Sequence, residues 1–169
     1  MKNPIKNCYW VVPDRFLAGE YPGDLHDLTP NTKIESLLDA GITCFIDLTA
    51  EEDGLDPYYQ LLEQRSDLSV QYKRFSIANY SIPTSREQTV TILDEIDRIL
   101  ESSGKVYIHC WGGIGRTGTM VGCWLSRHGY PGAKALEQLG KLWKQCPKSR
   151  RLKSPETSEQ EQYITNWSE

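Results

Sequence analysis

Two kinds of apolar pattern alternate along this chain and restrict the folds open to it. Short runs rich in β-branched and aromatic residues predict strands, and the stretches between them carry apolar residues at helical spacing. The expected strands cover 9–12, 16–18, 42–48, 70–77 and 105–109, and the expected helices cover 32–39, 55–66, 85–104, 116–128, 132–146 and 156–167. Strands that alternate with helices predict a three-layer α/β fold, with a central, mostly parallel sheet of four to five strands and helices on both faces.

The length of the chain indicates how many domains it forms, and its charge indicates which partners it can bind. A chain of 169 residues suits one domain spanning 1–169. Its formal net charge of −4, from 19 Lys and Arg against 23 Asp and Glu, argues against a nucleic-acid or membrane partner. No apolar run approaches the roughly 18 residues that span a bilayer, and the first residues lack the apolar centre of a secretory signal. We expect a cytoplasmic protein that acts as a monomer.

The five cysteines are scattered, and no two of them form a Cys-x-x-Cys pair. A disulfide framework or a zinc site needs an even, clustered set, and the three histidines are also dispersed, so we expect no metal. Four of the cysteines are expected to be small apolar fillers of the core, namely Cys8, Cys44, Cys123 and Cys146. The fifth, Cys110, lies in a segment of a different kind.

The segment 106–118 carries the chemistry. Cys110 comes at the carboxyl end of an expected strand, Arg116 follows six residues later, and the turn between them is rich in glycine. Glycines let successive backbone N–H groups point inward as an anion-binding nest, and the start of the next helix adds partial positive charge there. Arginine can bind two phosphoryl oxygens as a fork. The same donors favour the thiolate of Cys110, which makes it a candidate nucleophile toward a cradled phosphorus atom.

The run His-Cys-Trp-Gly-Gly-Ile-Gly-Arg-Thr-Gly over 109–118 resembles the signature of cysteine-dependent protein tyrosine phosphatases. The short chain resembles their compact dual-specificity branch with its small bacterial members, and the resemblance extends weakly over nearly the whole sequence. It implies that Cys110 forms a phosphocysteine and that Arg116 clamps the phosphate. It also implies that Thr117 hydrogen-bonds the sulfur and that His109 orients the loop from beneath. The backbone amides that would line the phosphate site are those of Trp111, Gly112, Gly113, Ile114, Gly115 and Arg116. The resemblance implies a phosphorylated protein or peptide as substrate and no cofactor.

One position departs from the family pattern. Relatives carry a general-acid aspartate some thirty residues before the nucleophile, in a loop after a strand, and this chain has Asn79 there. An amide cannot donate a proton as a carboxylic acid does, and loss of a general acid costs about 10²–10⁴ in rate. Three interpretations stay open. The protein is a phosphatase slowed into a substrate-trapping form, or it takes its acid from Glu51, Asp53 or Asp56, or it is a phosphate-reading module with little turnover.

Further side chains are candidates for positioning water and substrate. In the family a glutamine-bearing loop before the last helix positions the attacking water, and Glu156 and Gln160 occupy that place here. A capped helix start with acidic residues in its first turn explains the same two residues. Trp111 and Tyr80 could flank an aromatic phosphate. The signature loop holds no lysine, which disfavours the remaining alternative, an inositol-phosphate phosphatase.

Two expectations concern the surroundings of the signature loop. The basic stretch 148–153 is interpreted as a solvated surface loop that could attract an acidic phosphopeptide. Cys44 or Cys123 is a candidate partner for Cys110 in a protective disulfide, because reactive thiolates oxidise readily.

Overall fold

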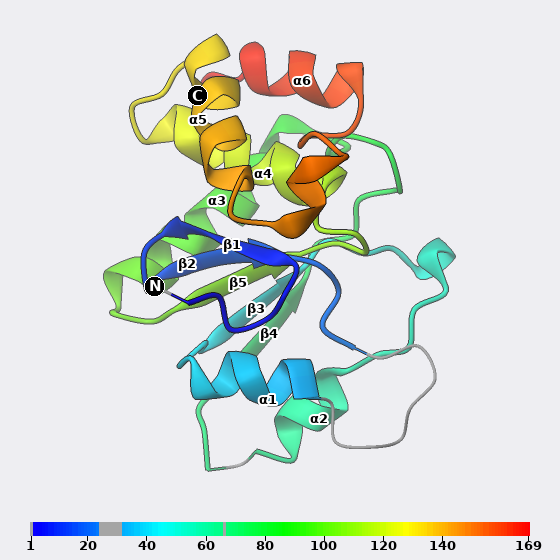
Figure 1. The fold of residues 1–169 in the computed structure, drawn as a ribbon, viewed down its shortest axis with the longest axis vertical. Helices are drawn as coiled ribbons and strands as arrows, with labels where there is room; N and C mark the ends of the chain where they lie inside the picture. Colours follow the sequence, from blue (N-terminus) through cyan, green and yellow to red (C-terminus); the bar gives the residue numbers. More distant parts are fainter. Residues whose placement is uncertain (1, 24–31, 66) are drawn as a thin grey trace.

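The structure, a computed structural model, describes residues 2–23, 32–65 and 67–169 and has a five-stranded sheet at its centre (Figure 1). The strands are β1 (Cys8–Val12), β2 (Phe16–Gly19), β3 (Cys44–Asp47), β4 (Gln71–Arg74) and β5 (Val106–His109). They lie in the order β1-β2-β5-β3-β4, and β1 pairs with β2 antiparallel while the other three pairings are parallel. The expected α/β fold around a mostly parallel sheet is confirmed.

Helices cover both faces of the sheet (Figure 1). One face carries α1 (Thr32–Asp39) and α2 (Tyr59–Glu63), and the other carries α3 (Arg86–Glu101), α4 (Gly115–Arg127), α5 (Ala133–Trp143) and α6 (Ser158–Thr165). Two short 3₁₀ turns, η1 (Glu51–Asp53) and η2 (Pro147–Arg150), lie in the connections. Within the described ranges, no helix combines the length and the apolar character that crossing a membrane requires.

Each face of the sheet has its own core because successive strand residues point to opposite sides. In β1, Tyr9 and Val11 pack with the side chains of α3 to α6, whereas Cys8 and Trp10 pack on the α1 side. This burial on both faces explains why the strands appear in the sequence as continuous apolar runs. α4 is the most deeply buried helix, with every residue from 115 to 125 inside. The helix that follows the signature loop therefore has a fixed position.

Two elements are shorter than the sequence predicts. The strand expected over 70–77 is confined to Gln71–Arg74, an edge strand whose side chains are half-buried or exposed. The helix expected over 55–66 is confined to Tyr59–Glu63, because Pro57 favours extended backbone at Asp56 and delays the helix start. Its expected end at Ser66 lies outside the described residues.

The carboxyl ends of the four parallel strands meet at one edge of the sheet. His109, the last residue of β5, is paired with Gly19 at the end of β2 and with Asp47 at the end of β3. Asp47 is in turn paired with Arg74 at the end of β4. The four loops that follow these strands therefore gather where α4 begins, which is the usual place for a ligand in a parallel α/β sheet.

Candidate active site

The loop after β5 turns sharply between Cys110 and Ile114 before α4 begins at Gly115. Gly113 has a φ of +71°, in the left-handed region that favours glycine, and a Cβ there would overlap the backbone of Gly19. Both the conformation and the close approach therefore require glycine at this position. The amides of residues 111–114 donate to no other described backbone group, so they are free to bind an anion.

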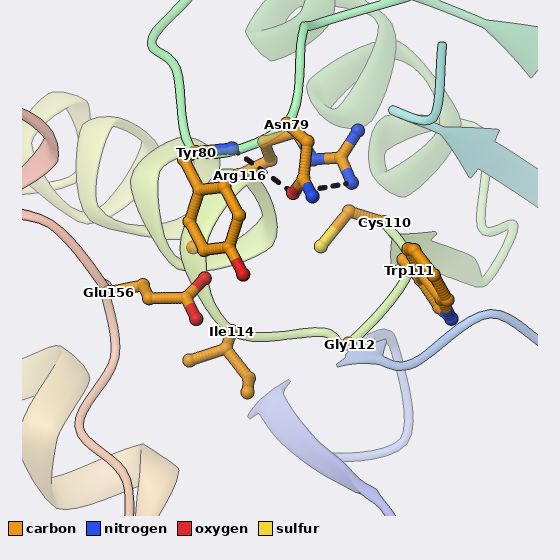
Figure 2. A pocket seen from close by; sticks show the side chains of 9 residues that line it. Asn79, Tyr80, Cys110, Trp111, Gly112, Ile114, Arg116 and Glu156 are labelled. Atoms are coloured by element: carbon orange, nitrogen blue, oxygen red, sulfur yellow. Dashed lines mark hydrogen bonds between the residues drawn. The ribbon is translucent and has the colours of Figure 1, made fainter. Parts of the chain in front are cut away.

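A pocket of about 280 Å³ opens at this loop. Its walls come from the loops after β4 and β5, the start of α4 and the segment before α6. The lining residues are Asn79, Tyr80, Cys110, Trp111, Gly112, Ile114, Gly115, Arg116 and Glu156. Figure 2 shows the Cys110 sulfur inside the pocket, with the Arg116 guanidinium near it and the Glu156 carboxylate entering from the opposite side. Cys110 is only 3% exposed, whereas Trp111 and Tyr80 are 45% and 59% exposed.

Arg116 is held by several acceptors at once. Its Nη1 donates to Asp53 Oδ2 at 2.6 Å and to the Ile77 carbonyl at 2.9 Å. Its Nη2 donates to Asp53 Oδ1 and to Asn79 Oδ1, both at 3.2 Å. Burial alone would lower the pKa of Arg116, but the hydrogen bonds with Asp53 and the charge of Cys110 outweigh burial and raise it. The guanidinium is therefore a permanent positive charge beside the Cys110 sulfur.

The two side chains that hold Arg116 differ in their relation to the pocket. Asn79 lines the pocket together with Arg116, whereas Asp53 is not among the lining residues. The Asp53 side chain is 3% exposed, and its Oδ2 also accepts from the Ala50 amide at 2.9 Å. The arrangement makes Asp53 a fixed counterion of the guanidinium and leaves Asn79 as a partner on the pocket side.

Glu156 is the carboxylate that the structure brings into the pocket. The sequence offered Glu51, Asp53 and Asp56 as alternative acids, and none of these lines the pocket. Glu156 lines it, and its Oε2 lies 3.0 Å from the point that a Cβ on Gly115 would occupy. The sequence indicated Glu156 as a candidate for positioning water, and the structure brings its carboxylate to the pocket from a segment 40 residues after Arg116.

His109 supports the loop from beneath, as expected. Its Nδ1 lies 3.1 Å from the Cys110 carbonyl, which can only accept, so this nitrogen carries the proton. Its Nε2 lies 2.6 Å from the Tyr58 hydroxyl and accepts from it. Complete burial lowers the pKa of His109 although Asp47 lies close by. The ring is therefore neutral and fixed in one tautomer, with its N–H directed at the loop.

Two of the expected contacts are corrected by the structure. The Thr117 hydroxyl is buried and has no hydrogen-bond partner in the described part of the chain, so the bond to the Cys110 sulfur is not formed. Gln160 does not line the pocket, because its amide is engaged elsewhere. Its Oε1 accepts from the amides of Glu156 and Thr157, and its Nε2 donates to the Ser81 carbonyl. The capped helix start is confirmed, with Thr157 as the N-cap of α6.

The candidate disulfide partner Cys44 lies too far from Cys110. It is paired with Val106, four residues before Cys110, which is about 13 Å along the strand. A disulfide needs Cα atoms within roughly 7 Å of each other. The Cys44–Cys110 bond therefore cannot form without rearranging the sheet, and burial raises the pKa of the Cys44 thiol to about 12. Cys123, the other candidate, is a free thiol buried in α4, and burial raises its pKa as well.

A comparison with models of protein families shows which family the chain belongs to. Residues 5–164 match the family model described as "Swiss Army Knife protein, DSP-PTPase phosphatase domain". The chain belongs to this family, and hence to the dual-specificity-like branch of the cysteine-dependent protein tyrosine phosphatases.

Individual relatives agree with this placement. The chain is 29% identical to "Putative tyrosine phosphatase 067L" of Invertebrate iridescent virus 3 over 126 residues, which cover 72% of this chain and 47% of the viral protein. It is 27% identical to the dual specificity protein phosphatase CDC14B of Mus musculus over 132 residues, which cover 70% of this chain and 24% of the mouse protein. The chain therefore spans about half of the viral relative and about a quarter of the mouse one.

Solved structures share the fold. The active form of Tk-PTP superposes with a TM-score of 0.71 at 23% identity, covering 94% of this chain and 93% of that one. Kinase associated phosphatase (KAP), with its catalytic-site cysteine replaced by serine, gives a TM-score of 0.71 at 18% identity, covering 97% and 94%. At these identities the likeness establishes the common architecture.

Proposed function

We propose that this protein hydrolyses phosphate monoesters, above all phosphotyrosine in a protein or peptide, through a phosphocysteine intermediate on Cys110. One observation carries the proposal: the Cys110 sulfur and the Arg116 guanidinium line one pocket, at a loop whose free amides precede α4. This combination suits a dianionic phosphoryl group and a nucleophile beneath it. Membership of the phosphatase family supports the same chemistry in general terms.

In the first step the Cys110 thiolate attacks phosphorus, so that a sulfur–phosphorus bond forms while the bond to the ester oxygen breaks. The loop amides and Arg116 bind the equatorial oxygens, where negative charge concentrates. A phosphoryl oxygen then takes the place of Asn79 on Arg116, because Asn79 is the side-chain partner of the guanidinium that lines the pocket. Asp53 keeps the guanidinium in position from the other side.

The departing oxygen needs a proton, and we assign its donor to Glu156. Glu156 contributes the carboxyl group among the described pocket residues, and Figure 2 shows it opposite Cys110 and Arg116 across the pocket. Asn79 has no acidic proton to give. An aspartate at that position would face Arg116 and be held as a carboxylate.

In the second step water attacks the phosphocysteine, the sulfur–phosphorus bond breaks, and phosphate and the Cys110 thiolate are restored. Glu156, ionised by the first step, accepts the proton of the attacking water.

An aromatic substrate fits the mouth of the pocket. Trp111 and Tyr80 are the large exposed aromatic side chains in its lining, and both can contact a phenyl ring. The phosphorylated residue would belong to a protein or peptide. We also propose that residues 1–169 act as one domain and as a monomer, and that the protein works in the cytoplasm.

The test is phosphate release from a phosphotyrosine peptide by the wild type and by Cys110→Ser. We expect the wild type to turn over and the variant to bind the peptide without releasing phosphate, because the hydroxyl is a weak nucleophile but the clamp is intact. Appreciable turnover by Cys110→Ser would remove Cys110 as the nucleophile.

Two other outcomes would select other functions. Saturable binding of the peptide without release by the wild type would favour a phosphate-reading module. A strong preference for an inositol polyphosphate over the peptide would favour an inositol-phosphate phosphatase, although the described pocket lining contains no lysine.

A further inference from the structure

The basic stretch 148–153 is exposed over 150–153, as expected of a surface loop, but Lys148 at its start and Ser154 just after its end reach the signature loop. Lys148, in η2, donates from Nζ to the Gly112 carbonyl at 2.8 Å. Ser154, just after the stretch, donates from Oγ to the Ile114 carbonyl at 2.8 Å in a buried hydrogen bond. These contacts join positions 36 and 40 residues apart in the chain.

Because the peptide group is planar, a hydrogen bond to a loop carbonyl also fixes the direction of the next N–H group in the phosphate site. In a trans peptide the carbonyl of one residue and the N–H of the next point in opposite directions. A bond from Lys148 to the Gly112 carbonyl therefore directs the Gly113 amide the other way. A bond from Ser154 to the Ile114 carbonyl does the same for the amide of Gly115.

The amides of Trp111 and Gly112, at the start of the loop, are directed in the same manner. The Cys110 carbonyl is held by the His109 ring at 3.1 Å, and the Trp111 carbonyl accepts from the Tyr21 amide at 2.9 Å. Four carbonyls of the loop are thus bound. Those of Cys110, Trp111 and Gly112 accept from one described donor each, and that of Ile114 accepts from Ser154 and, within α4, from the Gly118 amide at 3.1 Å. Lys148 and Ser154 supply two of these donors, both with side chains rather than backbone.

Lys148 is itself fixed by a half-buried carboxylate. Its ammonium lies 2.9 Å from Glu20 Oε2, and Glu20 also pairs with Lys33 at 3.0 Å. Burial alone would raise the pKa of Glu20, but Lys148 and Lys33 outweigh burial and lower it. The ionised Glu20 therefore anchors the ammonium group in reach of the Gly112 carbonyl.

Ser154 is fixed by direct packing on α4. A Cβ at Gly118 would overlap the Ser154 hydroxyl, and a Cβ at Gly115 would meet the side chains of Glu156 and Gln160. Because the two glycines of the first turn of α4 have no side chain, the segment that begins at Ser154 can pack directly against the helix. This explains Gly118, the last residue of the signature, as the position that lets Ser154 reach the loop.

We propose that Lys148 and Ser154 are positioning residues of the phosphate site: by holding the carbonyls of Gly112 and Ile114, they aim the amides of Gly113 and Gly115 at the bound phosphate. The inference rests on the proposed function only in taking phosphate as the bound group. Lys148 acts through the loop, without touching the phosphate.

The test compares Lys148→Met with Lys148→Arg, using inorganic phosphate as the probe in calorimetric titrations. We expect Lys148→Met to weaken phosphate binding about tenfold, as loss of one charge-assisted hydrogen bond implies, and Lys148→Arg to restore most of it. Ser154→Ala should weaken binding about fivefold. Lys153→Met is the matched control, since Lys153 is exposed and pairs only with Glu161 among the described residues, and its phosphate affinity should stay at the wild-type value.

Two readouts separate positioning from a charge effect or a general loss of structure. In amide NMR spectra, phosphate should shift the Gly113 resonance strongly in the wild type and weakly in Lys148→Met. The affinity ratio between the two should persist from 0.05 to 0.5 M salt, because a hydrogen bond of this kind is screened little. A ratio that falls to one at high salt would overturn the proposal in favour of simple electrostatic attraction.

The remaining outcomes are distinct for the two proposals. A folded Lys148→Met that binds phosphate within twofold of the wild type overturns the positioning role while leaving the hydrolase proposal intact. Weakened phosphate binding by this variant, in a wild type that never releases phosphate from an ester, supports the positioning role and overturns the hydrolase proposal. A wild type that does not bind phosphate overturns both.

Discussion

Replacing Asp53 by alanine should destabilise the protein strongly, because Arg116 would be left as a buried charge without its counterion. The two side chains are 3% and 2% exposed, and two hydrogen bonds of 2.6 Å and 3.2 Å join them. Breaking a buried pair by removing one partner costs about 3–5 kcal/mol. Water in the pocket can reach Arg116 from the Asn79 side, so we expect a loss of about 3 kcal/mol in the free energy of unfolding. The whole free energy of unfolding of a domain of this size is about 5–15 kcal/mol.

The assay is equilibrium unfolding in urea. The slope of the free energy of unfolding against urea concentration is compared among the variants, since an unchanged slope means that a shifted midpoint reports stability alone. Asp53→Asn keeps an oxygen acceptor and should lose about half as much. Glu52→Ala, in the same 3₁₀ turn but exposed, is the matched control and should stay within about 0.5 kcal/mol of the wild type.

Inorganic phosphate supplies a second, independent readout. At 100 times its dissociation constant a ligand stabilises the folded state by about 2.7 kcal/mol. Phosphate should therefore offset most of the loss in Asp53→Ala, because it brings negative charge to the Asn79 side of Arg116. An Asp53→Ala variant within 0.5 kcal/mol of the wild type, with an unchanged urea slope, would refute the reasoning that this pair holds the guanidinium.

Three more results follow from the site. Glu156→Gln should lower kcat on a phosphotyrosine peptide by about 10²–10³ and less on p-nitrophenyl phosphate, whose leaving group needs no proton; equal losses on both would count against Glu156 as the donor. Asn79→Asp should change kcat less than threefold and weaken phosphate binding, because the new carboxylate competes for Arg116; a tenfold rise in kcat would instead put the acid at position 79. Because burial holds the pKa of His109 below the ordinary value of about 6.5, the unfolded chain binds this proton first, and stability should fall as pH drops below about 6.5. Urea midpoints measured from pH 7.5 to 5 should fall less steeply for His109→Asn, and identical slopes would contradict this.

The fold and the centre of the site could be predicted because their signals are local. The strand, the glycines and the helix start around Cys110 and Arg116 lie within 13 consecutive residues, and each residue type has one physical reason to be there. The alternation of strand and helix patterns sets the sheet and the edge where this segment ends. The predicted limits of β4 were wrong because an edge strand is not marked by an apolar run.

The partners of the site could not be predicted because they come from distant segments. Asp53 reaches Arg116 from the loop after β3, 63 residues away, and the sequence shows only an acidic turn there. Lys148 looks like one member of a solvated basic run, and its bond to Gly112 depends on how η2 packs against the loop. Glu156 and Gln160 are four residues apart and were assigned together, yet one lines the pocket and the other caps a helix.

The most direct measurement of the central claim is mass spectrometry of the protein quenched in acid during turnover of a phosphotyrosine peptide. We expect one added phosphoryl group on the proteolytic fragment that contains Cys110, absent in Cys110→Ser. The group should be more abundant in Glu156→Gln turning over p-nitrophenyl phosphate, because that leaving group needs no proton and only the second step is slowed. Phosphate release at a steady rate with no phosphorylated Cys110 fragment at any time would contradict it.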